Sequence, residues 1–300
     1  MIPQSRSPAV SVVVIGYNMA RELPRTVFSL SPPYQNGVDA SDVEIIVVDN
    51  GSDRPADISE LTQQACAVRV LNVPHPNKSP ARAANFGVAQ ARGDIIGLWI
   101  DGARLASPGI LRGVLDSQRL RPAAGILTLG LHLGPGPQQE SMLNGYDQRA
   151  EDRLLETIDW REDGYRLFQI ASLARSSSEG WFSELAESNG IFMHRELWHE
   201  LSGLDEAFTL PGGGLVNLDL LQRMLAASPV DPVTLLGEGT FHQIHGGVST
   251  NARVSPWPEF AREYREIRGR DFEPVSYSSR FYSCVDRHRL LDIFRAFQPV

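Results

Sequence analysis

The sequence predicts an α/β fold with a mostly parallel central sheet and flanking helices. The first 130 residues alternate short apolar, β-branched runs with amphipathic segments, which is typical of buried parallel strands joined by helices. Each apolar run is too short for a helix and ends in Gly, Asn, Asp or Pro. An apolar content of 42% over 300 residues can fill a sizeable core and excludes a disordered ground state.

Five apolar runs are predicted to be strands, and the segments between them helices. The predicted strands are 10–16, 43–49, 68–73, 94–101 and 125–131. In the first spacer, Leu23, Val27 and Leu30 recur at helical spacing. An alanine-rich segment around 84–91 favours a helix packed closely on the sheet, and 109–119 is predicted to be the next helix.

The pattern weakens from residue 133 to residue 187, where we predict a loop-rich insertion. This stretch contains Gly-Pro-Gly-Pro at 134–137, many charges and a serine run. Long irregular stretches inside a compact domain tend to be binding loops or lids, so we expect acceptor contacts here.

Regular structure is predicted to resume after the insertion and to continue into a C-terminal extension. We expect a strand over 188–194, then a helix through Leu197 and Leu201. Further helices are predicted over 217–227 and 257–268. The chain therefore divides into a main domain, 1–250, and a helical extension, 251–300, packed on it.

Composition limits the partners that the protein can have. It has 28 Lys and Arg against 36 Asp and Glu, a net charge of −8, which argues against a nucleic-acid partner. The sequence has neither an apolar run of about 18 residues nor an N-terminal signal-type apolar region. Cys66 and Cys284 lack metal-type spacing. We expect a protein without a transmembrane segment, either cytoplasmic or peripheral at the membrane.

Ligands of an open parallel sheet bind at the carboxyl ends of its strands, where loops converge. The first predicted strand ends at Tyr17 and Asn18, the second at Asp49, and the fourth at Asp101. These polar groups are expected to meet at one edge. A Gly-x-Gly-x-x-Gly turn is absent from the first crossover, which disfavours an NAD-type site.

Four motifs occur in order along the chain. They are VSVVVIGYN at 10–18 with EIIVVDNGS at 44–52, ANFG at 84–87 with ARGD at 91–94, LWID at 98–101, and GLDEAF at 203–208. Together they resemble the family-2 glycosyltransferases of GT-A fold over roughly residues 10–250. The resemblance implies a GT-A-like, Rossmann-like nucleotide-binding domain. It further implies transfer of a sugar from a nucleoside diphosphate sugar, with a UDP-sugar favoured, to a glycan, a lipid-linked glycan or a small molecule.

The resemblance also implies nucleotide-binding residues, namely Tyr17, Asn18, Asp49, Arg82 and Asp101. Each has a plainer alternative. Asp49 could form an Asx turn with the glycine that follows, and Asn18 could cap the next helix. Arg82 suits a diphosphate but could be a solvated helix residue.

A divalent metal is expected from the resemblance, with a changed set of ligands. Asp101-Gly102-Ala103 stands where the family has Asp-x-Asp, and His245 before two glycines matches a C-terminal metal ligand of some GT-A enzymes. Asp101 and His245 are therefore the predicted ligands of Mn²⁺ or Mg²⁺. Imidazole favours Mn²⁺. His242 is expected to pack structurally, and Arg104 is an alternative to the metal.

The catalytic base is expected to be a carboxylate, as in an inverting transfer. Val216-Asn217 occupies the place of the family's Glu-Asp pair, which leaves Asp219 as the candidate base. Two other functions fit the same fold. One is a nucleotidyltransferase, although the first loop lacks its glycine-rich phosphate turn, and the other is a non-catalytic nucleotide-binding module.

Overall fold

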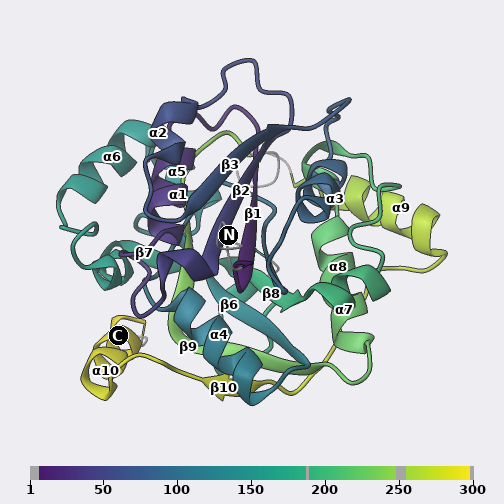
Figure 1. The fold of residues 1–300 in the computed structure, drawn as a ribbon. Coiled ribbons are helices and arrows are strands. Elements are labelled where there is room, and N and C mark those ends of the chain that lie inside the picture. The colour runs from purple at the N-terminus through teal and green to yellow at the C-terminus, as the bar shows by residue number, and fades with distance from the viewer. Residues whose placement is uncertain (1–6, 187–188, 248–254, 298–300) are drawn as a thin grey trace, which may run out of the picture.

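The computed structural model describes residues 7–186, 189–247 and 255–297, and a single curled sheet runs through them (Figure 1). Its strand order is β10-β9-β6-β8-β4-β1-β2-β3. These strands are β1 (Val10–Gly16), β2 (Val43–Asp49), β3 (Ala67–Asn72), β4 (Ile95–Trp99), β6 (Ala124–Leu133), β8 (Ile191–His194), β9 (Asp231–His242) and β10 (Arg280–Tyr282). Two short strands lie off this path, because β5 (Arg104–Ala106) pairs with β9 and β7 (Ala171–Leu173) pairs with β6.

The sheet consists of two parallel parts joined by one antiparallel strand. Strands β3, β2, β1 and β4 run parallel to one another, and so do β6, β9 and β10. Between these parts, β8 is antiparallel to both β4 and β6. The predicted α/β class with a mostly parallel sheet is therefore confirmed, and the antiparallel strand is an addition to it.

Helices cover both faces of the sheet, which explains the continuous apolar runs of the first strands. Along β1, Val12 and Val14 belong to one core cluster, and Val13 and Ile15 belong to the other. A strand that is buried on both faces has no solvent-facing side, so polar and apolar residues do not alternate along it. The helices are α1 (Leu23–Leu30), α2 (Ile58–Thr62), α3 (Ala81–Ala89), α4 (Ile110–Leu120), α5 (Gln138–Leu143), α6 (Gln148–Glu156), α7 (Arg195–Glu200), α8 (Val216–Ala226), α9 (Trp257–Arg268) and α10 (Arg287–Ala296).

The segment 133–187 is more regular than its composition indicates. It contains α5, α6 and two short 3-10 helices, and β7 adds to the edge of β6 over three residue pairs. Strand β9, which lies between β6 and β10, is not among the strands expected from the sequence. Its apolar pattern is broken by Gly237, which has φ 78°, in an irregular stretch of the β6–β9 pairing. Glu187 and Ser188 lie outside the described residues.

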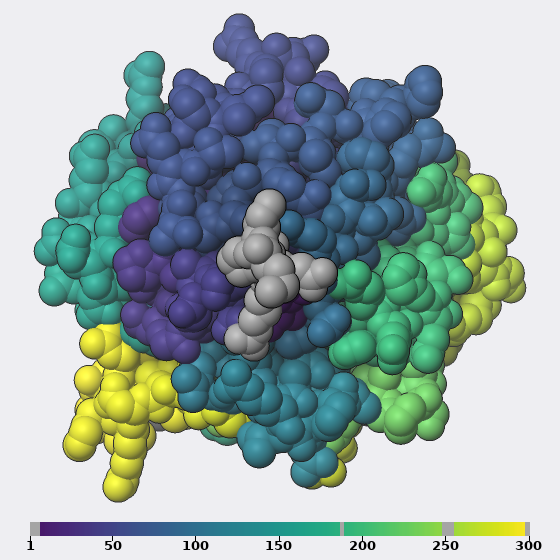
Figure 2. All heavy atoms as spheres, in the orientation of Figure 1, coloured from purple at the N-terminus to yellow at the C-terminus, as the bar shows by residue number. Residues whose placement is uncertain are grey.

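Residues 255–297 pack on the rest of the described chain at separated places. Figure 2 shows their yellow atoms at the lower left and at the right edge, where Figure 1 places α10 and α9. Between them, β10 pairs in parallel with β9. Among the described residues, no helix has the length and apolar composition needed to cross a membrane.

Candidate functional site

The carboxyl ends of β1, β2 and β4 meet at one edge of the sheet. The backbone N–H of Asn50 donates to Gly16 O at 2.8 Å, and that of Gly102 donates to Ile15 O at 2.8 Å. The loops that follow β2 and β4 therefore flank the end of β1. This is the edge at which ligands of such sheets bind.

The loop after β1 is fastened to the loop after β2 through Asn18. Its N–H donates to Ser52 Oγ at 2.8 Å, and its Oδ1 accepts from the N–H of Asp53 at 2.9 Å. Asn18 does not cap α1, whose N-cap residue is Glu22. Its neighbour Tyr17 is 54% exposed. Asn18 thus shapes this edge, and the Tyr17 ring is open to solvent beside it.

Asp49 forms the Asx turn that the sequence offers as an alternative to nucleotide binding. Only one of its two oxygens takes part in the turn. Its Oδ1 accepts from the N–H groups of Gly51 at 2.8 Å and Ser52 at 2.7 Å. Its Oδ2 makes no hydrogen bond to a described residue. A carboxylate held this way has a fixed orientation and keeps one oxygen for a ligand.

Arg82 lies in the first turn of α3, close to the loop after β2. Asn50 Nδ2 donates to Asn77 O and Ser79 O just before this helix. The Arg82 Nε donates to Glu206 Oε2 at 3.1 Å, and both side chains are more than 40% exposed. In this structure Arg82 therefore joins α3 to the segment 203–208.

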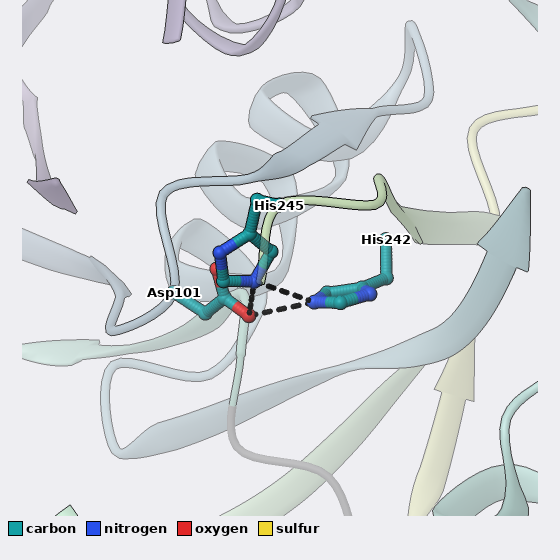
Figure 3. Close-up of side chains that lie close together, drawn as sticks. All are labelled: Asp101, His242 and His245. Atoms are coloured by element: carbon teal, nitrogen blue, oxygen red, sulfur yellow. Dashed lines mark hydrogen bonds and ion pairs between the residues drawn. The ribbon is translucent and has the colours of Figure 1, made fainter. Parts of the chain in front are cut away.

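Three side chains converge where β4 and β9 end (Figure 3). Asp101 Oδ1 accepts from the N–H of Ala103 at 3.1 Å, which leaves Oδ2 directed at two imidazoles. His242 Nε2 lies 2.8 Å from this Oδ2, and His245 Nε2 lies 3.3 Å from it. The two Nε2 atoms are 3.2 Å apart. We call Asp101, His242 and His245 the Asp-His-His cluster.

Burial and mutual charge set the protonation of the cluster. Burial lowers the pKa of His242 to about 4, although Asp101 opposes this. Burial alone would raise the pKa of Asp101, but the charges and hydrogen bonds of His245 and His242 hold that pKa well below its usual range. Asp101 in turn raises the pKa of His245, against the effect of its burial. At neutral pH the cluster has an ionised carboxylate and a neutral His242.

The Asp-His-His cluster fits a divalent cation. It offers one carboxylate oxygen and two imidazole nitrogens, all within 4.8 Å of one another. Oxygen and nitrogen donors of this kind suit Mn²⁺ better than Mg²⁺, which prefers oxygen alone. The exposed fraction of the Asp101 side chain is 24%, against 0% for His242, so the cluster is open on the Asp101 side.

Arg104, the alternative to a metal, is buried beside the cluster. It lies in β5 opposite His242, and its exposed fraction is 6%. Its NH1 donates to Thr240 Oγ1 at 3.4 Å. The charge of Arg104 contributes to lowering the pKa of His242. The guanidinium thus adds positive charge near the two imidazoles.

Three residues beyond the predicted ligands shape this site. His242, which the sequence predicts to pack structurally, lies in the cluster. Asn189 Oδ1 accepts from the N–H of Asp101 at 2.9 Å, and Gln138 contacts His242. The spacing of His242 and His245 after an apolar run was a usable signal. No sequence signal indicated a role for Asn189 or Gln138.

Asp219, the predicted base, lies outside the cluster, in the first turn of α8. Its Oδ2 accepts from Arg223 Nε at 2.8 Å, and its Oδ1 from Arg268 Nε at 2.6 Å. Arg268 also pairs with Asp205 at 2.7 Å. The carboxylate is 2% exposed. In this structure it ties α8 to α9 and to the 203–208 segment.

Comparison with known proteins gives a family match in the first part of the chain. Residues 11–114 match Glycosyl transferase family 2. An uncharacterized glycosyltransferase of Nostoc sp., alr2836, is 22% identical over 197 residues, which are 65% of this chain and 54% of the relative. The chain thus spans about half the length of that relative. The resemblance seen in the sequence motifs is confirmed by the family match.

Solved structures confirm the fold. S. aureus TarS 1-349 in complex with UDP-GlcNAc has a TM-score of 0.55 and 16% identity, covering 88% of this chain and 68% of that one. The longer TarS structure has a TM-score of 0.50 and 15% identity, covering 88% of this chain and 40% of that one. The fold is that of the GT-A glycosyltransferases.

Proposed function

We propose that the protein is a glycosyltransferase that moves a sugar from a nucleoside diphosphate sugar, preferably a UDP-sugar, to an acceptor hydroxyl. The observation that carries the proposal is the convergence of Asp101, His242 and His245 at the carboxyl edge of the sheet. The family match over residues 11–114 supports it. The UDP-GlcNAc complex of TarS supports the choice of donor.

In this proposal, the nucleoside lies against the loops after β1 and β2. Asp49 Oδ2 accepts a hydrogen bond from the base or the ribose, because its other oxygen is used by the Asx turn. The exposed ring of Tyr17 covers one side of the nucleoside, and Asn18 holds the loop that carries it. Arg82 leaves Glu206, its partner in this structure, and binds the diphosphate instead.

The Asp-His-His cluster would hold the divalent cation, with Mn²⁺ preferred. When bound, the ion would neutralise negative charge that develops on the departing diphosphate. Asp101 supplies a charged oxygen whose orientation is fixed by the N–H of Ala103. His242 and His245 supply neutral nitrogens from the end of β9 and the loop after it.

The acceptor hydroxyl needs a base, and Asp219 stays the candidate from the sequence. A general base needs an oxygen within hydrogen-bond reach of the hydroxyl proton. Both oxygens of Asp219 accept from arginines, so this role requires that Arg223 or Arg268 move on acceptor binding. The acceptor itself is proposed to be a glycan, a lipid-linked glycan or a small molecule.

Incubation with a panel of nucleotide sugars and Mn²⁺ tests the proposed function. Release of nucleoside diphosphate, followed by chromatography, is expected for a UDP-sugar and should be lost in Asp101→Asn. Release of pyrophosphate instead would establish a nucleotidyltransferase. Donor binding without release, with every acceptor class, would establish a binding module. Full turnover after EDTA treatment, together with loss of turnover in Arg104→Ala, would show that Arg104 neutralises the diphosphate in place of a metal.

A further inference from the structure

A large cavity lies at the end of the sheet opposite the Asp-His-His cluster. Its volume is about 1220 Å³, and the last turn of α1, the first turn of α4 and the start of α10 bound it (Figure 1). Tyr282 lines the cavity and pairs with Leu235 near the start of β9. His242 is the last residue of that strand, roughly 20 Å further along it. The cavity is therefore separate from the proposed donor site.

Aromatic rings form one wall of this cavity. Phe28 and Tyr34 line it, with their ring centroids 5.4 Å apart. The buried ring of Trp160 packs against both, at 5.6 Å from Phe28 and 6.1 Å from Tyr34. Small-molecule sites are mostly apolar and aromatic, with a few polar groups that fix the orientation of the ligand. Three rings that support one another make a wall of this kind.

Arg161 lies on the aromatic wall and supplies such a polar group. Its guanidinium carbon is 4.8 Å from the ring centroid of Phe28 and 4.6 Å from that of Trp160. Cation–π contacts with two rings hold the guanidinium in place. Within the described part of the chain, no group forms an ion pair or a hydrogen bond with this guanidinium. Its N–H donors are therefore available to a ligand.

The surroundings of Arg161 do not balance its charge. Burial and the positive charge of Arg25 lower the pKa of Arg161, and Glu60 and Tyr34 oppose this effect only in part. A negative group bound at Arg161 would relieve the repulsion from Arg25. A planar guanidinium suits a carboxylate, a sulfonate or a phosphate ester, because it can donate two parallel hydrogen bonds.

The other charged groups of the cavity limit the kind of anion that fits. Arg112 pairs with Asp116 at 2.5 Å, and Arg289 pairs with Asp163 at 2.6 Å, so the charges of these two arginines are already balanced. In all, four carboxylates and three arginines line the cavity. A polyphosphate would be repelled by the carboxylates, whereas a ligand with a single negative group can pair with Arg161.

We propose that this cavity is a second ligand site, which binds an organic anion with one charged group and an apolar body. The charged group pairs with Arg161, and the apolar body lies against the rings of Phe28 and Tyr34. The inference goes beyond the proposed function and does not depend on it, since no residue of the donor site lines the cavity.

The test uses two fluorescent probes that differ by one charged group. The first is 8-anilinonaphthalene-1-sulfonate, and the second is N-phenyl-1-naphthylamine, which has the same rings without the sulfonate. Fluorescence titration of the full chain gives the dissociation constant of each probe. The variant Arg161→Gln removes the positive charge. Arg149→Gln removes the charge of an exposed arginine of α6 outside the cavity and is the matched control.

We expect the affinity for the sulfonate probe to fall about 10-fold in Arg161→Gln and to stay unchanged in Arg149→Gln. The neutral probe should bind the wild type and Arg161→Gln equally, because it has no group that pairs with Arg161. Thermal unfolding verifies that each variant is folded. If Arg161→Gln does not fold, Arg161→Met, which keeps an apolar contact with the rings, takes its place.

Two competition experiments complete the test. Displacement of the sulfonate probe by benzoate would support a carboxylate ligand, and displacement by phenyl phosphate would support a phosphate ester. Displacement by neither would overturn the proposed class of ligand. Saturating UDP with Mn²⁺ should leave the titration unchanged, and displacement of the probe by UDP would overturn the inference, because the cavity would then be a nucleotide site.

Absence of binding of the sulfonate probe would also overturn the inference. Equal affinities in the wild type and folded Arg161→Gln would show that Arg161 only packs on the rings. Failure of the proposed function has a different signature, in which UDP does not bind although binding of the sulfonate probe still depends on Arg161.

Discussion

The two oxygens of the Asp101 carboxylate have different partners. Oδ1 accepts from the backbone of Ala103, which replaces the second acid of an Asp-x-Asp motif, and Oδ2 faces His242 and His245. In the proposed cation site, an imidazole from a distant strand takes the place of this second acid. Such an exchange would reduce the negative charge of the proposed cation site and favour cations that accept nitrogen ligands.

Both histidines are expected to contribute to Mn²⁺ affinity. His242→Ala and His245→Ala should each weaken Mn²⁺ binding by about 100-fold, equivalent to about 2.7 kcal/mol, because each removes one donor. Isothermal titration measures the affinities. His199→Ala, which removes an exposed histidine of α7, is the control and should bind like the wild type. An unchanged Mn²⁺ affinity in His242→Ala would show that His242 only packs and does not bind the cation.

Mn²⁺ affinity is also expected to depend on pH. Asp101 raises the pKa of His245, so His245 retains its proton to higher pH than an ordinary histidine. A bound cation must displace that proton, and affinity should therefore fall as pH drops from 8 through about 6.5. Calorimetry in buffers of different ionisation enthalpy should show about one proton released per ion at the lower pH. An affinity that is constant over this range would contradict the assignment.

At the scale of elements, α6 holds the loop that presents His245. Glu151 Oε2 accepts from the N–H of Ile244 at 2.9 Å, and its Oε1 accepts from Arg21 NH2 at 3.0 Å. The carbonyl of Ile244 accepts from Arg21 NH1 at 3.2 Å and from Gln148 Nε2 at 3.1 Å. The residue before His245 is therefore fixed on both sides of its backbone, by α6 and by Arg21, which precedes α1.

Removing Glu151 should disturb both stability and the cluster. Glu151→Ala leaves the N–H of Ile244 and the Arg21 guanidinium without this partner, which should cost about 1–3 kcal/mol of unfolding free energy. Mn²⁺ affinity should fall because the His245 loop loses an anchor. Urea unfolding and Mn²⁺ titration measure the two effects. Glu156→Ala, at an exposed carboxylate of the same helix, is the control and should change neither quantity. Equal effects in both variants would contradict this role of Glu151.

The ion pairs of Asp219, which join α8 to α9, lead to a second prediction. Asp219→Asn should lower the unfolding free energy by about 1–3 kcal/mol, because it weakens ion pairs to Arg223 and Arg268, which are about one quarter exposed. Arg268→Gln should destabilise similarly. If Asp219 is the base, Asp219→Asn must also abolish turnover that Arg268→Gln retains. Loss of turnover without loss of stability would limit Asp219 to catalysis.

At the scale of the whole molecule, a buried carboxylate joins three distant parts of the chain. Glu238 of β9 accepts from Ser107 Oγ, from Tyr165 OH at 2.7 Å and from the N–H of Gly109 at 3.1 Å. Cys284 of the C-terminal part lies 3.9 Å away. Burial raises the pKa of Glu238 from 4.5 to about 7. The folded protein therefore favours its protonated form.

This shift predicts how stability depends on pH. A raised pKa stabilises the folded state fully below pH about 4.5, and the contribution is lost as pH rises through about 7. Relative to Glu238→Gln, the wild type should lose up to about 3 kcal/mol of unfolding free energy between those values. Chemical unfolding of both proteins at pH 4.5, 6 and 8 measures the difference. A constant difference would show that the pKa of Glu238 is ordinary.

The sequence by itself determined the elements whose pattern is local. Strands β1 and β2 have the bounds expected for them, because runs buried on both faces are apolar throughout. Helix α9 also has its expected bounds, since helical periodicity is visible within a few turns. The candidate residues Asp101 and His245 could be selected because one follows a buried strand and the other precedes two glycines.

Only the tertiary structure decided which of these residues meet. His242 and Asp101 are 141 positions apart, and they touch because β9 lies next to β6 and pairs with β5 on its other side. The position of Gln138 against His242, and that of Glu151 against Ile244, likewise depends on how 133–187 folds over this end of the sheet. Local sequence encodes backbone conformation and burial, whereas strand order arises from the packing of the whole core. The residues of the candidate cation site were therefore partly predictable from the sequence, and the residues that contact them were not.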